Sequence, residues 1–487
     1  MESILVYNSF MESCIRDDFN FYNPAFTSSI ELIKKSPYKV IAFDEIIENL
    51  CNGTTPSGGK FENKGIYFFR SQNFSPESLD FEDMRYVTKE FHDKLKRSAL
   101  KPDDILIAVV GATIGVVSIV PKDLIEGNIN QNVCKITLRK NSNVLPYYVM
   151  TFLDSKFGKF QLFKESTITA KGYINNDKIK RLLIVVPNLD IQKIISGLMQ
   201  SAYFLRKQKL KQAEEKLDKI NDYVLKELGI NLSKIKDEKS FIISYSKITE
   251  RDDYNYYDAR VSNIMNEVVN GKYPFIHLGD KNTDILYGAS LKNEYFDDGI
   301  PFLRINNLKP NKIDLSEIVY LNKNMKKALR NAFVKEGDLL MSRSGTIGIV
   351  VCVPKEVEGF AFGSYQIKFT LSKDVNPKYA SIVLNTPIGT LQSERNTTGA
   401  VQMNITIPGI KNIKIPLPPL KIQNRIVNEV DNMMKESENL EKQSNEIVNK
   451  SKQIIEKLII NEPLSEQEDG FVSNVINESK KLRFTPE

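Results

Sequence analysis

The feature that most constrains the fold of this chain is an internal repeat with a period of about 230 residues. Three motifs return in the same order: Arg-Asp-Asp at 16–18 and 251–253, Gly-x-x-x-x-Arg at 65–70 and 299–304, and Ala/Gly-Thr-Ile-Gly at 112–115 and 345–348. Solenoid repeats span only ~20–50 residues, so a period this long indicates a duplicated domain. The sequence therefore predicts two similar globular units, and two similar units usually engage two similar targets.

The composition is that of an ordinary globular protein, and it excludes several classes. The chain has 487 residues, of which 41% are hydrophobic and 26% charged, and its net charge of +6 permits nucleic-acid binding without demonstrating it. No apolar run approaches the ~20 residues of a membrane span, and Met1-Glu2-Ser3 is not the basic start of a signal peptide, so we predict a cytoplasmic protein. The four cysteines form no Cys-x-x-Cys pair, so neither disulfides nor a zinc site is expected.

Each repeat has a strand-rich part followed by a long helix. Short β-branched and aromatic runs bounded by Gly and Pro predict mixed α+β structure over 14–186 and 249–415. After Pro418-Pro419, apolar and serine positions recur at steps of three and four: Ile426, Val430, Met433, Ser437, Leu440, Ser444, Ile447, Ser451, Ile454 and Leu458. The first copy has a matching seam: Leu210, Ala213, Leu217, Ile220, Val224 and Leu228. Such heptad seams are typical of coiled coils.

The two seams predict that the helices pair with each other in antiparallel fashion and act as a spacer between two globular heads. The alternative is that each helix packs only onto its own head. The predicted organisation is a first head, spacer helix 1, a second head, spacer helix 2 and a loose C-terminal tail with at most one short helix. Their predicted bounds are 1–186, 187–229, 230–415, 416–461 and 462–487.

No catalytic constellation can be assembled from the sequence. His92 and His277 lie in unrelated surroundings without metal-ligand spacing. The Gly-rich segment 53–60 fails the phosphate-loop pattern, because its lysine comes one residue late and Phe61 stands where Ser or Thr should be. Asp103-Asp104 lacks the Glu-x-Lys that would complete a nuclease motif, so a turn role is favoured. We therefore expect a non-enzymatic chain with no metal or cofactor of its own.

Polar side chains able to contact bases cluster at corresponding places in the two copies, in loops that differ while their flanks agree. Arginine can grip guanine and asparagine or glutamine can grip adenine, each worth ~1–3 kcal/mol of discrimination. The predicted DNA-binding residues are Arg70, Gln72, Asn73, Asn128, Asn130, Gln131, Lys171 and Asn175 in the first copy, and Arg304, Asn306, Asn307, Arg343, Ser364, Tyr365, Gln366, Arg395, Gln402 and Asn404 in the second. For any single residue, a solvated loop position is the competing interpretation.

Taken in order and twice over, these motifs resemble the specificity subunits of type I DNA restriction–modification systems. The repeated Gly-x-x-x-x-Arg strand, the Thr-Ile-Gly turns and the Ile-Pro-Leu-Pro-Pro-Leu-x-x-Gln run at 415–423 carry the resemblance, which covers about residues 14–460. It implies two recognition domains that each read half of a bipartite target in double-stranded DNA, with the unread gap set by the helices. It also implies partners: a methyltransferase (modification) subunit using S-adenosylmethionine, usually in two copies, and a restriction subunit driven by ATP and magnesium.

Two other interpretations stay open at this level. In a close variant, methylation and cleavage share one partner chain. In a different class, the chain is a non-catalytic coiled-coil scaffold whose two heads bind protein or other ligands, since divergent polar loops suit either role. Neither the target sequence nor the gap length can be deduced from the residues.

Overall fold

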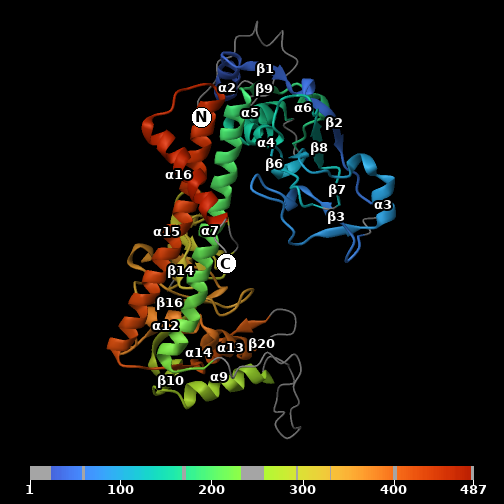
Figure 1. The fold of residues 1–487 in the computed structure, drawn as a ribbon. Coiled ribbons are helices and arrows are strands. Elements are labelled where there is room, and N and C mark those ends of the chain that lie inside the picture. Colours follow the sequence, from blue (N-terminus) through green and yellow to red (C-terminus); the bar gives the residue numbers. More distant parts are fainter. Residues whose placement is uncertain are drawn as a thin grey trace. The chain divides into compact units, whose positions relative to one another are not determined.

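The structure is a computed structural model that describes residues 24–56, 61–124, 126–166, 172–231, 257–291, 294–329, 331–398 and 403–483 (Figure 1). The chain divides into two compact units. Unit 1 is built from residues 1–210 and 441–487, and unit 2 from residues 211–440. Each unit thus combines one head with parts of both long helices, and the predicted bounds between heads and helices stay a prediction.

Unit 1 contains two small sheets flanked by helices. The four-stranded sheet has the order β2 (Ile47–Asn52), β8 (Val133–Leu138), β5 (Ile105–Ala108) and β6 (Val117–Ile119), all antiparallel. The three-stranded sheet has the order β4 (Arg85–Val87), β3 (Ile66–Phe69) and β7 (Gly127–Ile129), with β7 parallel to β3. The remaining elements are the pair β1 (Lys39–Ala42) and β9 (Leu183–Val186), and the helices α2 (Pro24–Lys34), α3 (Lys89–Lys94), α4 (Pro146–Asp154), α5 (Lys156–Glu165), α6 (Asn176–Lys180) and α16 (Glu466–Arg483).

Unit 2 repeats this topology. Its four-stranded sheet has the order β11 (Asn282–Tyr287), β19 (Gln366–Leu371), β16 (Leu339–Ser342) and β17 (Val350–Cys352). Its three-stranded sheet has the order β15 (Val319–Leu321), β12 (Ile300–Leu303) and β18 (Ala361–Phe362), again with one parallel pair. The remaining elements are the pairs β10 (Phe275–His277) with β22 (Lys414–Pro416), β13 (Leu308–Lys309) with β14 (Lys312–Ile313) and β20 (Thr397–Thr398) with β21 (Asn404–Ile405), and the helices α9 (Ala259–Val269), α10 (Leu278–Lys281), α11 (Lys326–Leu329), α12 (Pro377–Leu384), α13 (Pro387–Arg395) and α14 (Ile407–Lys411).

The same local signals produce corresponding elements in both units. The central strands β5 and β16 are buried at all four residues, as expected for short continuous apolar runs. Helices α4 and α12 each begin at a proline, Pro146 and Pro377, whose fixed φ suits a first helical turn. The predicted α+β class with an internal twofold repeat is confirmed.

The two long helices pair in antiparallel fashion. Helices α7 (Leu189–Leu228) and α15 (Leu420–Ile459) have 40 residues each (Figure 1). In unit 1, near the middle of both helices, Lys209 Nζ of α7 donates to Gln443 Oε1 of α15 at 3.0 Å. In unit 2 the end of α7 meets the beginning of α15, where Arg425 pairs with Glu227. The same helix segments also belong to the hydrophobic cores of the heads, so pairing and packing onto the heads occur together.

Two details of the helical prediction were wrong. Leu217, expected in the seam, is 41% exposed. Its neighbour Lys216 forms an ion pair with Glu436 across the helices, so the contact beside Leu217 is polar. The tail is also more ordered than expected, because α16 is an 18-residue helix held to α15 by an ion pair between Lys457 and Glu468 at 2.8 Å. Among the described residues, no helix has the length and apolarity needed to cross a bilayer.

Candidate nucleic-acid interface

Five loops of unit 2 converge at one edge of its two sheets. They are 287–289 after β11, 304–307 after β12, 343–345 after β16, 363–365 before β19 and 404–406 before α14, and together we call them the loop edge of unit 2. Backbone bonds join them: Arg343 N–H donates to the Tyr365 carbonyl at 2.8 Å, and Ile405 N–H donates to the Arg343 carbonyl at 3.1 Å. Ser364 N–H donates to the Ala289 carbonyl at 2.9 Å. Residues distant in sequence are thereby fixed side by side.

The loop edge of unit 1 is formed by the corresponding segments 52–55, 70–73, 109–111, 130–132 and 172–175. Val109 N–H donates to the Asn132 carbonyl at 2.9 Å, and Ile174 N–H donates to the Val109 carbonyl at 3.1 Å. These bonds repeat the pattern of unit 2. The two edges therefore share a backbone framework that carries different side chains.

One glycine in each unit is needed for the loops to meet. A Cβ built on Gly53 would lie 1.8 Å from the Ile129 carbonyl oxygen, and one on Gly288 would lie 2.1 Å from that of Gly363. No side chain fits at such distances, because the two backbones touch directly. The close approach is thus a property of the duplicated framework.

The arginines of the Gly-x-x-x-x-Arg motif are bound within their own units. Arg70 Nη2 donates to the Asp83 carbonyl at 2.5 Å, and Arg304 Nη2 donates to the Glu317 carbonyl at 2.7 Å, which is the equivalent position. Arg70 also forms an ion pair with the Asp83 carboxylate at 3.1 Å. Because both copies keep the same internal bond, the structure supports a role in holding the turn for both arginines, and their predicted base contact stays a prediction.

Four predicted base-contacting amides are buried, and most of their polar atoms are used inside the protein. Asn73 and Asn307, 1% and 2% exposed, each accept a bond from the backbone N–H of the motif arginine and donate to a carbonyl opposite. Asn128 is fully buried, with its oxygen 2.6 Å from His92 Nδ1. Because these three side chains bond inside their own units, they are not among the base contacts proposed below, and their predicted base contact stays a prediction.

Gln366 is the fourth of these amides. It is fully buried, and its Nε2 donates to the Leu303 carbonyl at 2.9 Å. Its Oε1 is buried and has no hydrogen-bond partner in the described part of the chain. The side chain links the loop before β19 to the end of β12, which is a framework role.

The other candidates within the described residues are at least partly accessible. Tyr365 is 57% exposed. The remaining accessible candidates are Gln72, Asn130, Gln131 and Asn175 in unit 1, and Asn306, Arg343, Ser364, Arg395 and Asn404 in unit 2. Asn175 uses its side-chain oxygen to cap α6, accepting from Lys178 N–H at 2.9 Å. Lys171 and Gln402 lie outside the described residues.

Exposed aromatic side chains beside these candidates were missed by sequence reasoning. Tyr287 is 39% exposed, and the Arg343 guanidinium carbon lies 4.7 Å from the centre of its ring. Tyr295 is 42% exposed and stands in the same relation to Arg304, at 5.6 Å. The available signal was the position of Tyr287 directly before Gly288, at the end of a strand entering the loop edge.

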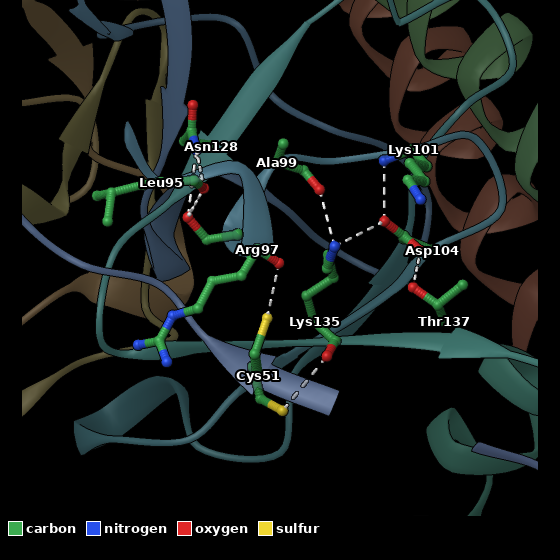
Figure 2. A network of polar contacts seen from close by, with 11 residues as sticks. Cys51, Leu95, Arg97, Ala99, Lys101, Asp104, Asn128, Lys135 and Thr137 are labelled. Atoms are coloured by element: carbon green, nitrogen blue, oxygen red, sulfur yellow. Dashed lines mark hydrogen bonds and ion pairs between the residues drawn. The ribbon is translucent and has the colours of Figure 1, made fainter. Parts of the chain in front are cut away.

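The acidic pair at 103–104 serves a buried structural network (Figure 2). Asp104 is fully buried and accepts from Lys101 N–H at 2.8 Å and from Thr137 Oγ1 at 2.5 Å. The Lys135 ammonium lies between this carboxylate, at 3.6 Å, and the Ala99 carbonyl, at 2.8 Å (Figure 2). The turn role expected for this acidic pair agrees with these contacts.

The nearby cysteine is not positioned as a nucleophile. The Cys51 thiol donates to the Arg97 carbonyl at 3.0 Å (Figure 2). Burial raises the pKa of the Cys51 thiol, which opposes formation of the reactive thiolate. The described residues also contain no group of three or more potential metal ligands.

Comparison with known proteins assigns both halves of the chain to one family model. The model described as "Type I restriction modification DNA specificity domain" matches residues 35–216 and again residues 261–450. A relative named putative type I restriction enzyme MjaX specificity subunit, from Methanocaldococcus jannaschii, is 26% identical over 414 residues, which are 81% of this chain and 86% of the relative. The type I restriction enzyme EcoBI specificity subunit of Escherichia coli is 25% identical over 36% of each chain.

A solved structure from work on complex assembly and conformational transition of the type I R-M system has a similar fold. Its chain superposes with a TM-score of 0.50 at 14% identity, covering 87% of this chain and 97% of its own length. At this identity the similarity concerns the fold alone.

Proposed function

Because the chain belongs to the type I restriction–modification DNA specificity family, matched over both of its halves, we propose that its two loop edges each read one half of a bipartite DNA target. The observation that carries the proposal is the repeated backbone framework with divergent exposed side chains at the same edge. Two readers of different sequences need a common scaffold and different contacts.

The proposed base contacts come from the accessible candidates. In unit 1 they are Gln72, Asn130, Gln131 and Asn175, and in unit 2 they are Asn306, Arg343, Ser364, Tyr365, Arg395 and Asn404. Lys171 and Gln402 join them on sequence grounds alone. Amide and guanidinium groups distinguish base pairs in the major groove by their donor and acceptor patterns.

The proposal assigns the chemistry to partner subunits. A modification subunit using S-adenosylmethionine, in two copies, would methylate the target, and a restriction subunit using ATP and magnesium would cleave unmodified DNA. In support, Asp104, His92 and the Cys51 thiol are occupied with internal contacts. The proposed role of this chain is to select the DNA and bring the partners to it.

We further propose that the paired helices determine the number of unread base pairs between the half-sites. Helix length supports this idea, since 40 residues at about 1.5 Å each give a continuous element of about 60 Å. Inserting seven residues into α7 and seven at the facing position of α15 should lengthen the unread gap and leave both half-sites unchanged. An unchanged gap in this double insertion would contradict the spacer role.

The direct test is to express the chain with its modification subunits and map methylated positions across the host DNA. The expected result is one bipartite sequence, lost when the chain is deleted. Binding to that duplex should weaken steeply with salt, because phosphate contacts release counterions. Methylation independent of the chain, or binding with no salt dependence, would favour a protein-binding scaffold instead.

A further inference from the structure

Tyr287 holds a single arginine in place at the loop edge of unit 2. The Arg343 guanidinium carbon lies 4.7 Å from the centre of the Tyr287 ring, a distance at which the cation and the ring attract each other. The tyrosine is itself fixed, because its hydroxyl accepts from Ile407 N–H at 3.3 Å, at the beginning of α14. The backbone of Arg343 is bonded to the Tyr365 loop on one side and to Ile405 on the other. The guanidinium is therefore held before any ligand arrives.

The protein uses little of the bonding capacity of this guanidinium. An arginine side chain has five N–H donors. Within the described residues its one protein acceptor is the Ser364 carbonyl, at the long distance of 3.4 Å from Nη1. Its Nε is buried and has no partner among those residues. An unsatisfied buried donor costs free energy, and the described residues give Arg343 no short hydrogen bond that offsets this cost.

A second arginine in the same unit provides the contrast. Arg304 also lies over an aromatic ring, that of Tyr295, and its Nε is likewise buried without a partner among the described residues, but its Nη2 donates to the Glu317 carbonyl at 2.7 Å. Arg70 makes the equivalent bond in unit 1. The carbonyl bond of Arg304 thus recurs in both units, whereas the contact of Arg343 with Tyr287 is found in unit 2 alone among the described residues.

The equivalent positions in unit 1 carry neither group. Aligning Gly53 with Gly288 places Asn52 opposite Tyr287, and the matching backbone bonds place Val109 opposite Arg343. Phosphates are present in every duplex, so a phosphate contact would serve both copies equally. A cation present in one copy only is what direct recognition of a base predicts.

We propose that Tyr287 is a positioning residue that holds Arg343 to recognise a guanine in the second half-site. This inference rests on the proposed function. It identifies the group that Arg343 would bind as the guanine of a G·C pair, presented in the major groove. Guanine offers O6 and N7 as adjacent acceptors, which match the paired donors of a guanidinium. The first head recognises its half-site without an arginine at this position.

The test uses the full chain in complex with its modification subunits, and duplexes carrying the methylation-mapped target. Each base pair of the second half-site is replaced in turn, and binding is measured for wild type, Tyr287→Leu, Tyr287→Phe and Arg343→Ala. Phe296→Leu is the matched control, since Phe296 is also an exposed aromatic side chain of unit 2, at 42%. Wild-type protein is tested in addition on a duplex in which 7-deazaguanine, lacking N7, replaces the guanine.

We expect one G·C position at which Tyr287→Leu and Arg343→Ala each lose discrimination on the order of tenfold. Their double variant should lose no more than Arg343→Ala alone, and Tyr287→Phe, which keeps the ring, should restore discrimination. 7-Deazaguanine should weaken wild-type binding and leave Tyr287→Leu unaffected. Discrimination of the first half-site should not change, which shows that the variants are folded.

Three results would overturn the inference: equal weakening on every sequence, unchanged discrimination in Tyr287→Leu, or wild-type binding insensitive to 7-deazaguanine at every guanine of that half-site. Each leaves the proposed function intact, because the wild-type complex still recognises a bipartite target. If wild type itself shows no sequence preference, the proposed function fails, and the inference fails with it.

Discussion

The two units share several buried polar contacts and differ at their loop edges. Three internal contacts occur in both: a tyrosine hydroxyl bonded to a strand carbonyl (Tyr148 and Tyr379), a glutamine bonded to the strand beside it (Gln161 and Gln392), and a glutamine closing the start of each long helix (Gln192 and Gln423). A buried polar group needs a hydrogen-bond partner in both copies, whereas an exposed loop residue is constrained only by the ligand that it binds. Divergence between the copies therefore marks the residues free to define a target.

The largest effect on DNA recognition is expected from exchanging a whole head. Replacing residues 14–186 with the corresponding region of another family member should change one half-site completely and leave the other untouched. We expect methylation at the original first half-site to fall by at least about 10³-fold, the usual margin between specific and non-specific binding. Mapping of methylated sequences measures this, and a change in both half-sites would show that the heads do not read independently.

Removing the buried aspartate that pairs with a lysine should destabilise unit 1 more than unit 2. Asp104→Ala leaves the Lys135 ammonium buried without a carboxylate partner, and breaking such a pair costs about 3–5 kcal/mol. Asp338→Ala should cost less, because Lys368 retains a second carboxylate, Asp284, at 3.5 Å.

Urea denaturation followed by fluorescence measures both variants. The chain contains no tryptophan, so one introduced at an exposed aromatic position, Phe81 in unit 1 or Phe296 in unit 2, reports on its own unit. Equal losses in the two units would contradict the role assigned to the second carboxylate.

Alkaline pH should also distinguish the units. Burial raises the pKa of Tyr147, Tyr148 and Tyr203 in unit 1 and of Tyr379 in unit 2. A folded-state pKa above the unfolded value means that stability is complete below about pH 10 and is lost as the pH rises further, by about 1.4 kcal/mol per pH unit for each tyrosine. Unit 1, which has more such tyrosines, should therefore lose stability more steeply above pH 10 than unit 2, measured with the same tryptophan reporters. Parallel losses would contradict this assignment.

The smallest expected effects test whether a duplicated hydrogen bond contributes the same free energy of unfolding in both units. Tyr148→Phe removes a bond to the Val185 carbonyl at 2.5 Å, and Tyr379→Phe removes one to the Pro416 carbonyl at 2.7 Å. Each should cost about 1 kcal/mol, because a buried carbonyl loses its partner. Unequal losses of stability would mean that the two units have diverged in their cores as well as at their loop edges.

The sequence predicted the repeat, the α+β heads and the antiparallel helices, because these depend on patterns that extend over many residues. It did not separate framework from contact residues, as Asn73 and Gln72 show. Both are amides beside the same turn, yet Asn73 bonds across the turn and is buried, while Gln72 is exposed. Residue type gives the donors and acceptors, and only the folded backbone decides whether they face inward. Leu217 failed similarly, since its burial depended on the facing helix.

The division of α7 and α15 between the units has a consequence for how the protein is made. Unit 2 consists of the continuous stretch 211–440, so all of it has left the ribosome while unit 1 still lacks residues 441–487. The core of unit 1 includes Val448, Ile454 and Ile455, so the head that is translated first exposes apolar surface until residues 441–487 have been made. Translation pauses or truncations late in the message should therefore harm the N-terminal half of the protein most.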